Sequence, residues 1–221
     1  MERSVGKEAG TERLTAMNKI YSITQKTENS HLNFYEMDVT DRKGKHFSYY
    51  MASRAKRMEE LKMNKGEMPD QPDGVVIYSL WGEKKDHVVL VRQYRYPLGG
   101  FIYEFPAGLV EMGEDFHQAA IREMKEETGL IFRPKKADSM YEKPFYTTVG
   151  MTDECCSMVF GEAEGAVSRD GLEDSEELEV VLADRKEAER ILKEERVALM
   201  CAYMLMHFLH DTENPFGFLR V

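Results

Sequence analysis

Cysteine is scarce in this chain of 221 residues, and its pattern excludes two common kinds of site. The three cysteines are Cys155, Cys156 and Cys201, of which two are neighbours. An odd count with an adjacent pair matches neither a disulfide framework nor the spacing of a structural zinc site. The cysteines therefore indicate a reducing compartment, and the adjacent pair is typical of a strand with one side chain on each face.

Long hydrophobic runs are also missing. The first residues, Met1–Ser4, do not lead into the apolar segment of a signal peptide. The most apolar late segment, Val197–Leu209, is shorter than the roughly 20 residues with which a helix crosses a bilayer. We therefore expect a cytoplasmic protein without a membrane partner.

Positive charge is in deficit, since 30 Lys and Arg residues face 40 Asp and Glu residues and leave a net charge of −10. Binding to nucleic acid or to an anionic membrane depends on clustered basic side chains, so both are excluded as general partners. An acidic protein that handles a phosphate compound needs a cation between itself and that compound. The hydrophobic content of 42% is enough for a true core.

The N-terminal quarter of the chain has the pattern of a small antiparallel sheet. Residues 1–16 are polar and are expected to form a loose tail. Turn residues at Asp41–Gly44 separate two of the three β-like runs that follow within residues 17–56. A charged connector over residues 57–73 contains Gly66, Pro69 and Pro72 and marks a domain boundary. The expected strands are Ile20–Thr24, Leu32–Val39 and His46–Ala52.

Residues 74–221 mix strands with a few helices, which predicts an α/β layered core with a mixed sheet between helices. Asp184 is placed as the N-cap of the second helix. The expected helices are Glu114–Thr128, Asp184–Glu194 and Val197–His210. The expected strands are Val75–Leu80, His87–Tyr94, Phe101–Phe105, Cys155–Phe160, Leu178–Leu182 and a stretch around Met140–Thr148.

The first of these helices carries charges on the side where a core is expected. At about 100° per residue, Phe116, Ala120, Glu123 and Glu127 project within roughly 60° of one another. Burying two carboxylates is unfavourable unless a cation lies between them. A hard divalent ion such as Mg²⁺ prefers oxygen ligands, and Glu126 adds a third carboxylate one turn from Glu123. Such a site predicts hydrolysis of a phosphoanhydride by metal-assisted positioning of water.

The stretch from Gly108 to Leu130 fits the spacing G-x5-E-x7-R-E-Φ-x-E-E-x-G-Φ at every fixed position, where Φ is aliphatic or Met. By this pattern the chain resembles the Nudix hydrolases. The alternative is an acidic surface helix with pairs such as Arg122–Glu126, but that explains neither the two glycines nor the misplaced carboxylates. The resemblance implies an α/β/α sandwich in which the motif forms loop–helix–loop.

The resemblance also implies roles for the charged residues of the motif. Glu123 and Glu127 would be the principal metal ligands, assisted by Glu126, and Mg²⁺ would be the metal, with Mn²⁺ as a substitute. Arg122 would orient these carboxylates by charge-assisted hydrogen bonds. Glu114 either belongs to this arrangement or lies near the helix start only because a carboxylate is favoured there.

Residues before the motif narrow the resemblance to the ADP-ribose pyrophosphatases and related nucleotide-sugar hydrolases. They read R-Q-Y-R-Y-P from Arg92 and E-F-P-A-G from Glu104. In that group the carbonyl of the Ala before the glycine binds metal, which implies Ala107. Arg95 and Glu104 would lie near the substrate. The alternative for Arg95 is a surface cation on a strand.

One position departs from that group. Its members carry S-P-G a little beyond the motif, where this chain has Val149 before Gly150. Valine does not fix φ as proline does, so the loop shape and a strict preference for ADP-ribose do not follow from the resemblance.

The group also has an acidic loop that supplies a catalytic glutamate, which implies the stretch Asp170–Glu179 here. Glu176 is the expected residue, with Glu173 and Glu177 as alternatives, and a solvated acidic loop is the simpler interpretation. The N-terminal sheet is often exchanged between subunits of a dimer in this group. That implies a homodimer in which Tyr49 and Arg54 contact the substrate.

The expectation is thus a homodimeric, Mg²⁺-dependent hydrolase of nucleotide diphosphate sugars, with ADP-ribose first, yielding AMP and ribose 5-phosphate. One alternative is hydrolysis of another nucleoside diphosphate derivative. The other is a sensor of the same fold that binds its ligand without cleaving it.

Overall fold

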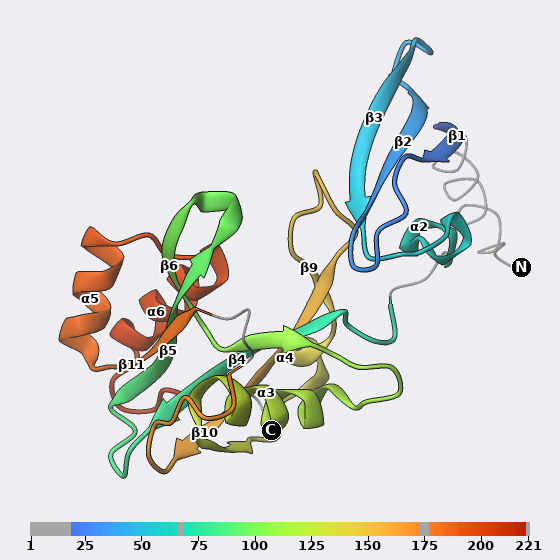
Figure 1. The fold of residues 1–221 in the computed structure, drawn as a ribbon. Coiled ribbons are helices and arrows are strands. Elements are labelled where there is room, and N and C mark those ends of the chain that lie inside the picture. Colours follow the sequence, from blue (N-terminus) through green and yellow to red (C-terminus); the bar gives the residue numbers. More distant parts are fainter. Residues whose placement is uncertain (1–18, 66–68, 173–176, 220–221) are drawn as a thin grey trace, which may run out of the picture. The chain divides into compact units, whose positions relative to one another are not determined.

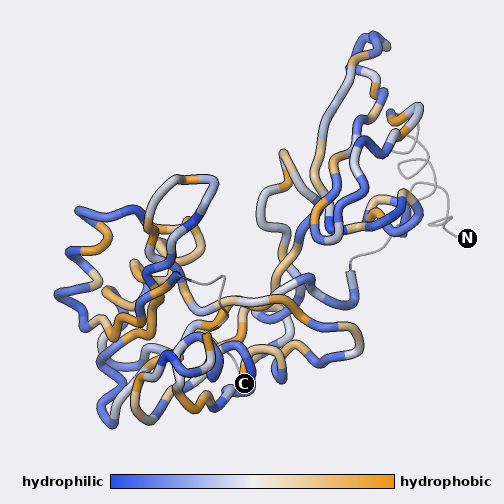
Figure 2. Tube along the Cα trace, viewed as in Figure 1, coloured by the Kyte–Doolittle hydropathy of each residue, from blue (hydrophilic) through white to orange (hydrophobic). Residues whose placement is uncertain are grey.

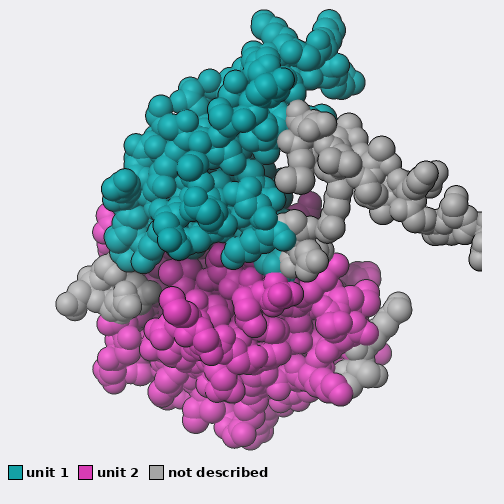
Figure 3. All heavy atoms as spheres, turned by 90° about the vertical axis from the view of Figure 1, so that its right-hand side faces the viewer, with its two compact units in different colours: residues 1–69, 146–154 teal, residues 70–145, 155–221 magenta. Residues whose placement is uncertain are grey.

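The computed structural model describes residues 19–65, 69–172 and 177–219. The predicted tail and the candidate residues Glu173 and Glu176 lie outside these ranges. The chain divides into two compact units, coloured separately in Figure 3. Unit 1 consists of the described residues up to Pro69 together with Tyr146–Glu154, and unit 2 consists of Asp70–Phe145 and the described residues from Cys155 onward.

Unit 1 is built on the three-stranded antiparallel sheet that the sequence predicts (Figure 1). Its strands are β1 (Ile20–Gln25), β2 (Asn33–Thr40) and β3 (His46–Ser53). The β2–β3 turn has Gly44 at φ 79°, and the Asp41 carboxylate accepts hydrogen bonds from the backbone N–H groups of Lys43 and Lys45. These contacts explain the sharp turn.

One face of this sheet is covered by the connector, which forms the short helices η1 (Met58–Glu60) and α2 (Lys62–Lys65). Tyr35, Met37 and Met51 from β2 and β3 pack with Leu61 into a small core. Their spacing of two residues within a strand follows the alternation of side chains between the two faces.

Residues 146–154 complete unit 1, although the sequence placed them with residues 74–221. The backbone N–H of Ala52 donates to the carbonyl of Met151 at 2.9 Å, and Ala52 forms a parallel bridge with Thr152. This distant segment therefore continues the sheet beside β3.

Unit 2 contains a mixed sheet with the order β11-β5-β4-β10-β8. The pair β4–β10 is parallel, whereas β11–β5, β4–β5 and β10–β8 are antiparallel. β6 pairs with β5, and β7 pairs with the beginning of β4. The strands are β4 (Gly74–Trp81), β5 (His87–Arg95), β6 (Gly100–Glu104), β7 (Ala107–Leu109), β8 (Ile131–Pro134), β10 (Cys155–Glu164) and β11 (Leu178–Ala183).

Helices cover both faces of this sheet, as an α/β/α sandwich requires (Figure 1). On one face, α3 (Phe116–Thr128) packs Ala120 and Met124 against Ile77 and its neighbours. On the other face, α5 (Arg185–Glu194) and α6 (Leu199–His210) bury residues such as Leu205. Figure 2 shows α6 as largely hydrophobic and α5 as largely hydrophilic. None of the helices in the described ranges combines the length and apolarity needed to cross a bilayer.

The stretch around Met140–Thr148 differs from the expected strand. Asp138 accepts a hydrogen bond from the N–H of Met140 and caps a single helical turn, α4 (Ser139–Glu142). Within this stretch, only β9 (Phe145–Tyr146) is extended. Elsewhere in the unit, the 3₁₀ turn η2 (Tyr96–Leu98) connects β5 to β6. The prediction was wrong here because the N-cap of Asp138 outweighs the weak alternation that follows it.

Candidate active site

Helix α3 buries the carboxylates that the sequence placed on its apolar side. Glu127 is only 2% exposed, the Glu123 side chain is 12% exposed, and the Glu126 side chain is 45% exposed. The N–H of Ala107 on β7 donates to Glu127 Oε2 at 3.1 Å. Asp115 caps the helix start by accepting from the N–H groups of His117 and Gln118. The folded helix therefore carries Glu123 and Glu127 on its buried side.

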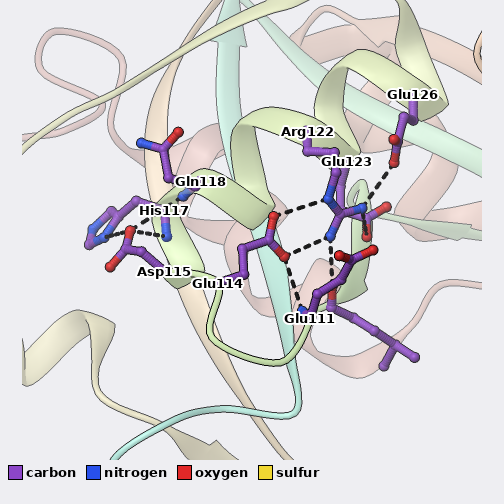
Figure 4. Close-up of polar contacts among 9 residues, drawn as sticks. Glu111, Glu114, Asp115, His117, Gln118, Arg122, Glu123 and Glu126 are labelled. Atoms are coloured by element: carbon purple, nitrogen blue, oxygen red, sulfur yellow. Dashed lines mark hydrogen bonds and ion pairs between the residues drawn. The ribbon is translucent and has the colours of Figure 1, made fainter.

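Arg122 gathers three carboxylates around one guanidinium (Figure 4). Its Nε and Nη2 donate to the two oxygens of Glu114 at 3.1 and 3.0 Å. Its Nη1 donates to Glu123 Oε1 at 2.8 Å and to Glu126 Oε2 at 3.0 Å. Nη2 also donates to the carbonyl of Leu109 at 2.9 Å, which ties the helix to β7.

Glu114 is thus the principal partner of Arg122, one of the two alternatives that its sequence position left open. The hydrogen bonds from Arg122 and from the N–H of Glu111 lower the pKa of Glu114 below its ordinary value. The same contact with Glu114, followed by those with Glu123 and Glu126, raises the pKa of Arg122. In the sequence, this contact is indicated by the separation of eight residues between Glu114 and Arg122, which is about two helical turns.

Gly108 lies against the carboxylate of Glu123. A Cβ atom on Gly108 would fall 1.9 Å from Glu123 Cδ and 2.0 Å from its Oε1. No side chain is tolerated there while Glu123 keeps this position. The β7 backbone therefore contacts both inward carboxylates, through Ala107 to Glu127 and through Gly108 to Glu123.

The donor set fits a hard divalent cation, since it consists of carboxylate and carbonyl oxygens. Among the described residues, no three His, Cys, Asp or Glu side chains converge as a ready-made metal cluster. Arg122 instead holds Glu123 and Glu126. The structure thus places Ala107 against Glu127 and Gly108 against Glu123, while Arg122 hydrogen-bonds Glu123 and Glu126.

Arg95 and Glu104, both predicted near the substrate, form an ion pair across β5 and β6. Arg95 Nε donates to Glu104 Oε2 at 2.7 Å, and Arg95 remains partly exposed. Pairing fixes the guanidinium while leaving its remaining N–H groups for another acceptor.

The beginning of the acidic loop lies on the C-terminal turn of α3. The N–H of Ser168 donates to the carbonyl of Thr128 at 3.0 Å. A Cβ atom on Gly171 would fall 2.8 Å from the carbonyl oxygen of Glu126. Glu177 is exposed, and its carbonyl accepts from the N–H of Tyr94. The loop thus starts next to the residues that carry the carboxylates.

Tyr49 and Arg54 belong to unit 1, where both contact residues 146–154. The Tyr49 hydroxyl donates to the carbonyl of Gly150 at 2.8 Å, and Arg54 Nη2 donates to Glu154 Oε1 at 2.9 Å. A cavity of about 400 Å³ lies in this unit. Its walls include Met37, Tyr49, Met51, Tyr146, Val149 and Met151.

Val149, the departure from the expected proline, lies in the wall of this cavity and is 73% exposed. The sequence identified the position but gave no sign that it belongs with the N-terminal sheet. Only the pairing of residues 146–154 with unit 1 shows this.

Comparison with known proteins agrees with this geometry. The NUDIX domain matches residues 70–200. A putative nudix hydrolase 2 of Caenorhabditis elegans is 37% identical over 119 residues, which cover 51% of this chain and 52% of that protein. An ADP-ribose pyrophosphatase of Bacillus subtilis is 31% identical over 137 residues, covering 62% of this chain and 71% of that protein.

A solved structure of an ADP compounds hydrolase has the same fold. It superposes with a TM-score of 0.60 at 16% identity and covers 90% of this chain and 95% of its own. The match of the domain to more than half of the sequence, together with the arrangement of α3 and β7, leads to one conclusion. This chain belongs to the Nudix family.

Proposed function

We propose that this protein is a Mg²⁺-dependent pyrophosphohydrolase of nucleotide diphosphate sugars. ADP-ribose is the substrate that we expect it to prefer, and its cleavage gives AMP and ribose 5-phosphate. The observation that carries the proposal is the burial of Glu127 and Glu123 against the β7 backbone at Ala107 and Gly108. The relatives named ADP-ribose pyrophosphatase support the choice of substrate.

Four residues would hold the metal: Glu123, Glu126 and Glu127 through their carboxylates, and Ala107 through its carbonyl. When bound, Mg²⁺, or Mn²⁺ in its place, supplies charge neutralisation of the pyrophosphate and acidification of a bound water. Arg122 acts through the carboxylates, because its guanidinium fixes Glu123 and Glu126 with hydrogen bonds of 2.8 and 3.0 Å.

Glu176 is proposed as the group that accepts the proton of the attacking water. It lies outside the described residues. Its support is the contact of residues 168–171 with the C-terminal turn of α3, which starts the acidic loop beside Glu126. Glu173 and Glu177 are the alternatives that single substitutions would separate.

Substrate contacts are proposed for Arg95, Glu104, Tyr49 and Arg54. Arg95 is held by Glu104 and keeps N–H groups for phosphate or ribose oxygens. Tyr49 contributes an aromatic wall to the cavity of unit 1, which suits stacking of a nucleobase. Arg54 is oriented by Glu154.

We propose that the protein acts as a homodimer and that the sheet of unit 1 forms part of the interface. One face of this sheet exposes Phe34 on β2 and Tyr50 on β3, whose rings stack at a centroid distance of 5.7 Å. Exposed apolar surface of this kind is typical of association sites. Sedimentation of the wild type and of a Phe34→Ser, Tyr50→Ser variant tests this. A monomeric wild type contradicts it.

A cytoplasmic location remains a prediction from the cysteine content.

A substrate panel tests the proposed activity. ADP-ribose, other nucleoside diphosphate sugars and nucleoside triphosphates are incubated with Mg²⁺, and a phosphatase releases phosphate from the products for counting. We expect ADP-ribose to give the highest kcat/KM. A rank far below the other compounds would favour the alternative substrate class. Binding of ADP-ribose without turnover in Mg²⁺ or Mn²⁺ would favour a sensor.

A further inference from the structure

The start of β4 connects the Nudix motif to the rest of the sheet through Asp73 and Gly74. The carbonyl of Asp73 accepts from the N–H of Val110, just after β7, at 3.0 Å. Its N–H donates to the carbonyl of Cys155 at 2.8 Å, and its carboxylate accepts from the Cys155 N–H at 2.8 Å. This junction therefore fixes β7 and the start of β10 on either side of β4.

At the same point, two glycines allow β4, β7 and a side chain of α3 to approach closely. Gly74 pairs with Leu109, and Val75 pairs with Gly108. A Cβ atom on Gly74 would fall 2.8 Å from the carbonyl oxygen of Gly108. Gly108 in turn leaves no space for a side chain beside the Glu123 carboxylate. The backbone of β4 thus contacts the backbone of β7, and the backbone of β7 contacts the carboxylate of Glu123.

We propose that Gly74 is a positioning residue for the divalent metal site, a role that rests on the proposed function. A methyl group 2.8 Å from a backbone oxygen forces β7 to shift, because a carbonyl cannot rotate away as a flexible side chain can. The same strand holds Glu127 through the N–H of Ala107 and confines Glu123 through Gly108. Gly74 therefore acts on both carboxylates without contacting the metal or the substrate.

If Gly74 served only the packing of the sheet, its substitution would lower stability without a specific loss of metal affinity. A substitution at Gly161 distinguishes this role from the proposed one. A Cβ atom on Gly161 would fall 2.4 Å from the carbonyl oxygen of Arg133, where β10 pairs with β8 in the same sheet. Gly161→Ala therefore introduces a clash with a backbone oxygen, and with the Phe132 ring at 2.6 Å, on a different strand pair. It serves as the matched control for Gly74→Ala.

The experiment measures Mn²⁺ binding to the full chain by electron paramagnetic resonance of the free ion, without substrate, together with the melting temperature. We expect Gly74→Ala to weaken Mn²⁺ binding about tenfold. Gly161→Ala is expected to lower the melting temperature and leave Mn²⁺ affinity within about twofold of the wild type. Equal weakening in both variants, or unchanged affinity in folded Gly74→Ala, would overturn the proposal.

Asp73 provides a second route if Gly74→Ala does not fold. Asp73→Ala removes the acceptor for the Cys155 N–H and loosens the same junction, whereas Asp73→Asn keeps an oxygen acceptor of the same size. We expect Mn²⁺ affinity to fall in Asp73→Ala and to recover in Asp73→Asn, and equal affinities would contradict the proposal. Wild-type Mn²⁺ binding without hydrolysis of any substrate would overturn the proposed activity alone. A wild type that binds no Mn²⁺ would overturn both.

Discussion

The two units differ in what they bury. In unit 2, apolar cores lie on both faces of the sheet, and the carboxylate of Glu127 is enclosed with only 2% exposure. In unit 1, one face of a three-stranded sheet packs on a small core around Tyr35, while Tyr49 is 39% exposed. Unit 2 therefore has the packing that holds charges at fixed positions, and unit 1 presents aromatic and methionine side chains to a cavity.

This difference suggests a division of work in the proposed reaction. Charge stabilisation depends on groups that do not reorganise, which favours a helix buried against a sheet. Binding of a flat heterocycle depends on apolar contact area and tolerates adaptable side chains such as methionine. Substitutions in unit 2 should then act on kcat, and substitutions in the cavity of unit 1 should act on KM.

The largest effect is expected for Glu127→Gln, which keeps the side-chain shape and removes one charge. Metal-assisted charge stabilisation contributes several kcal/mol, so loss of this ligand should lower kcat by about 10² to 10³-fold. Because the change also removes a buried charge, the melting temperature should not fall appreciably. Steady-state kinetics and calorimetry measure both. Glu189→Gln, at an exposed position of α5, is the control. Full activity of Glu127→Gln would refute its assignment as a ligand.

A smaller loss is expected for Arg122→Lys, which keeps the charge but not the forked geometry. Lysine cannot bind both oxygens of Glu114 and also reach Glu123 and Glu126. We expect kcat/KM to fall about 10 to 100-fold and the Mg²⁺ concentration at half-maximal rate to rise. Arg190→Lys is the matched control, because Arg190 on α5 pairs with Glu187 and with Glu195 just after the helix. An equal effect at both positions would show that the network serves folding alone.

Tyr49→Ala tests the role of unit 1. Stacking of a base on an aromatic ring contributes about 1–3 kcal/mol, so KM should rise about tenfold while kcat changes little. Tyr49→Phe keeps the ring but loses the hydrogen bond to Gly150, and it should retain most of the affinity. Tyr21→Ala, an exposed tyrosine on β1 that is not part of the cavity wall, is the control. A fall in kcat with unchanged KM would contradict the division between units.

The smallest effect is expected for the acid dependence of stability at Glu114. Its pKa is lowered in the folded state, so its contribution is present above the ordinary value of about 4.3 and lost as the pH falls through the folded pKa. Glu114→Gln should be less stable than the wild type at pH 7 by about 1 kcal/mol and converge with it in acid. Urea unfolding at several pH values measures this, with the exposed Glu111→Gln as control. Parallel curves would show that Glu114 contributes nothing through ionisation.

Much of the fold follows from local patterns along the chain. The N-cap of Asp184 predicted α5, and the turn at Asp41–Gly44 predicted the β2–β3 hairpin. Short strands escaped prediction, because β7 and β8 span only a few residues and depend on pairing with β4 and β10. The stretch around Met140 was misread because a side-chain cap competes with weak alternation.

The sequence by itself determined the family and the inward position of two carboxylates on α3. Helical periodicity and fixed spacings are local properties, which do not depend on how the elements pack. It also predicted hydrogen bonds from Arg122 to carboxylates of the motif, which the structure shows for Glu123 and Glu126. Only the tertiary structure decided that Glu114 is the chief partner of Arg122, that residues 146–154 join the N-terminal sheet, and that Gly74 lies close to the carbonyl of Gly108. The last two depend on contacts between segments distant in the chain, which no local pattern specifies, whereas the contact of Glu114 with Arg122 depends on the conformation of the turn before α3.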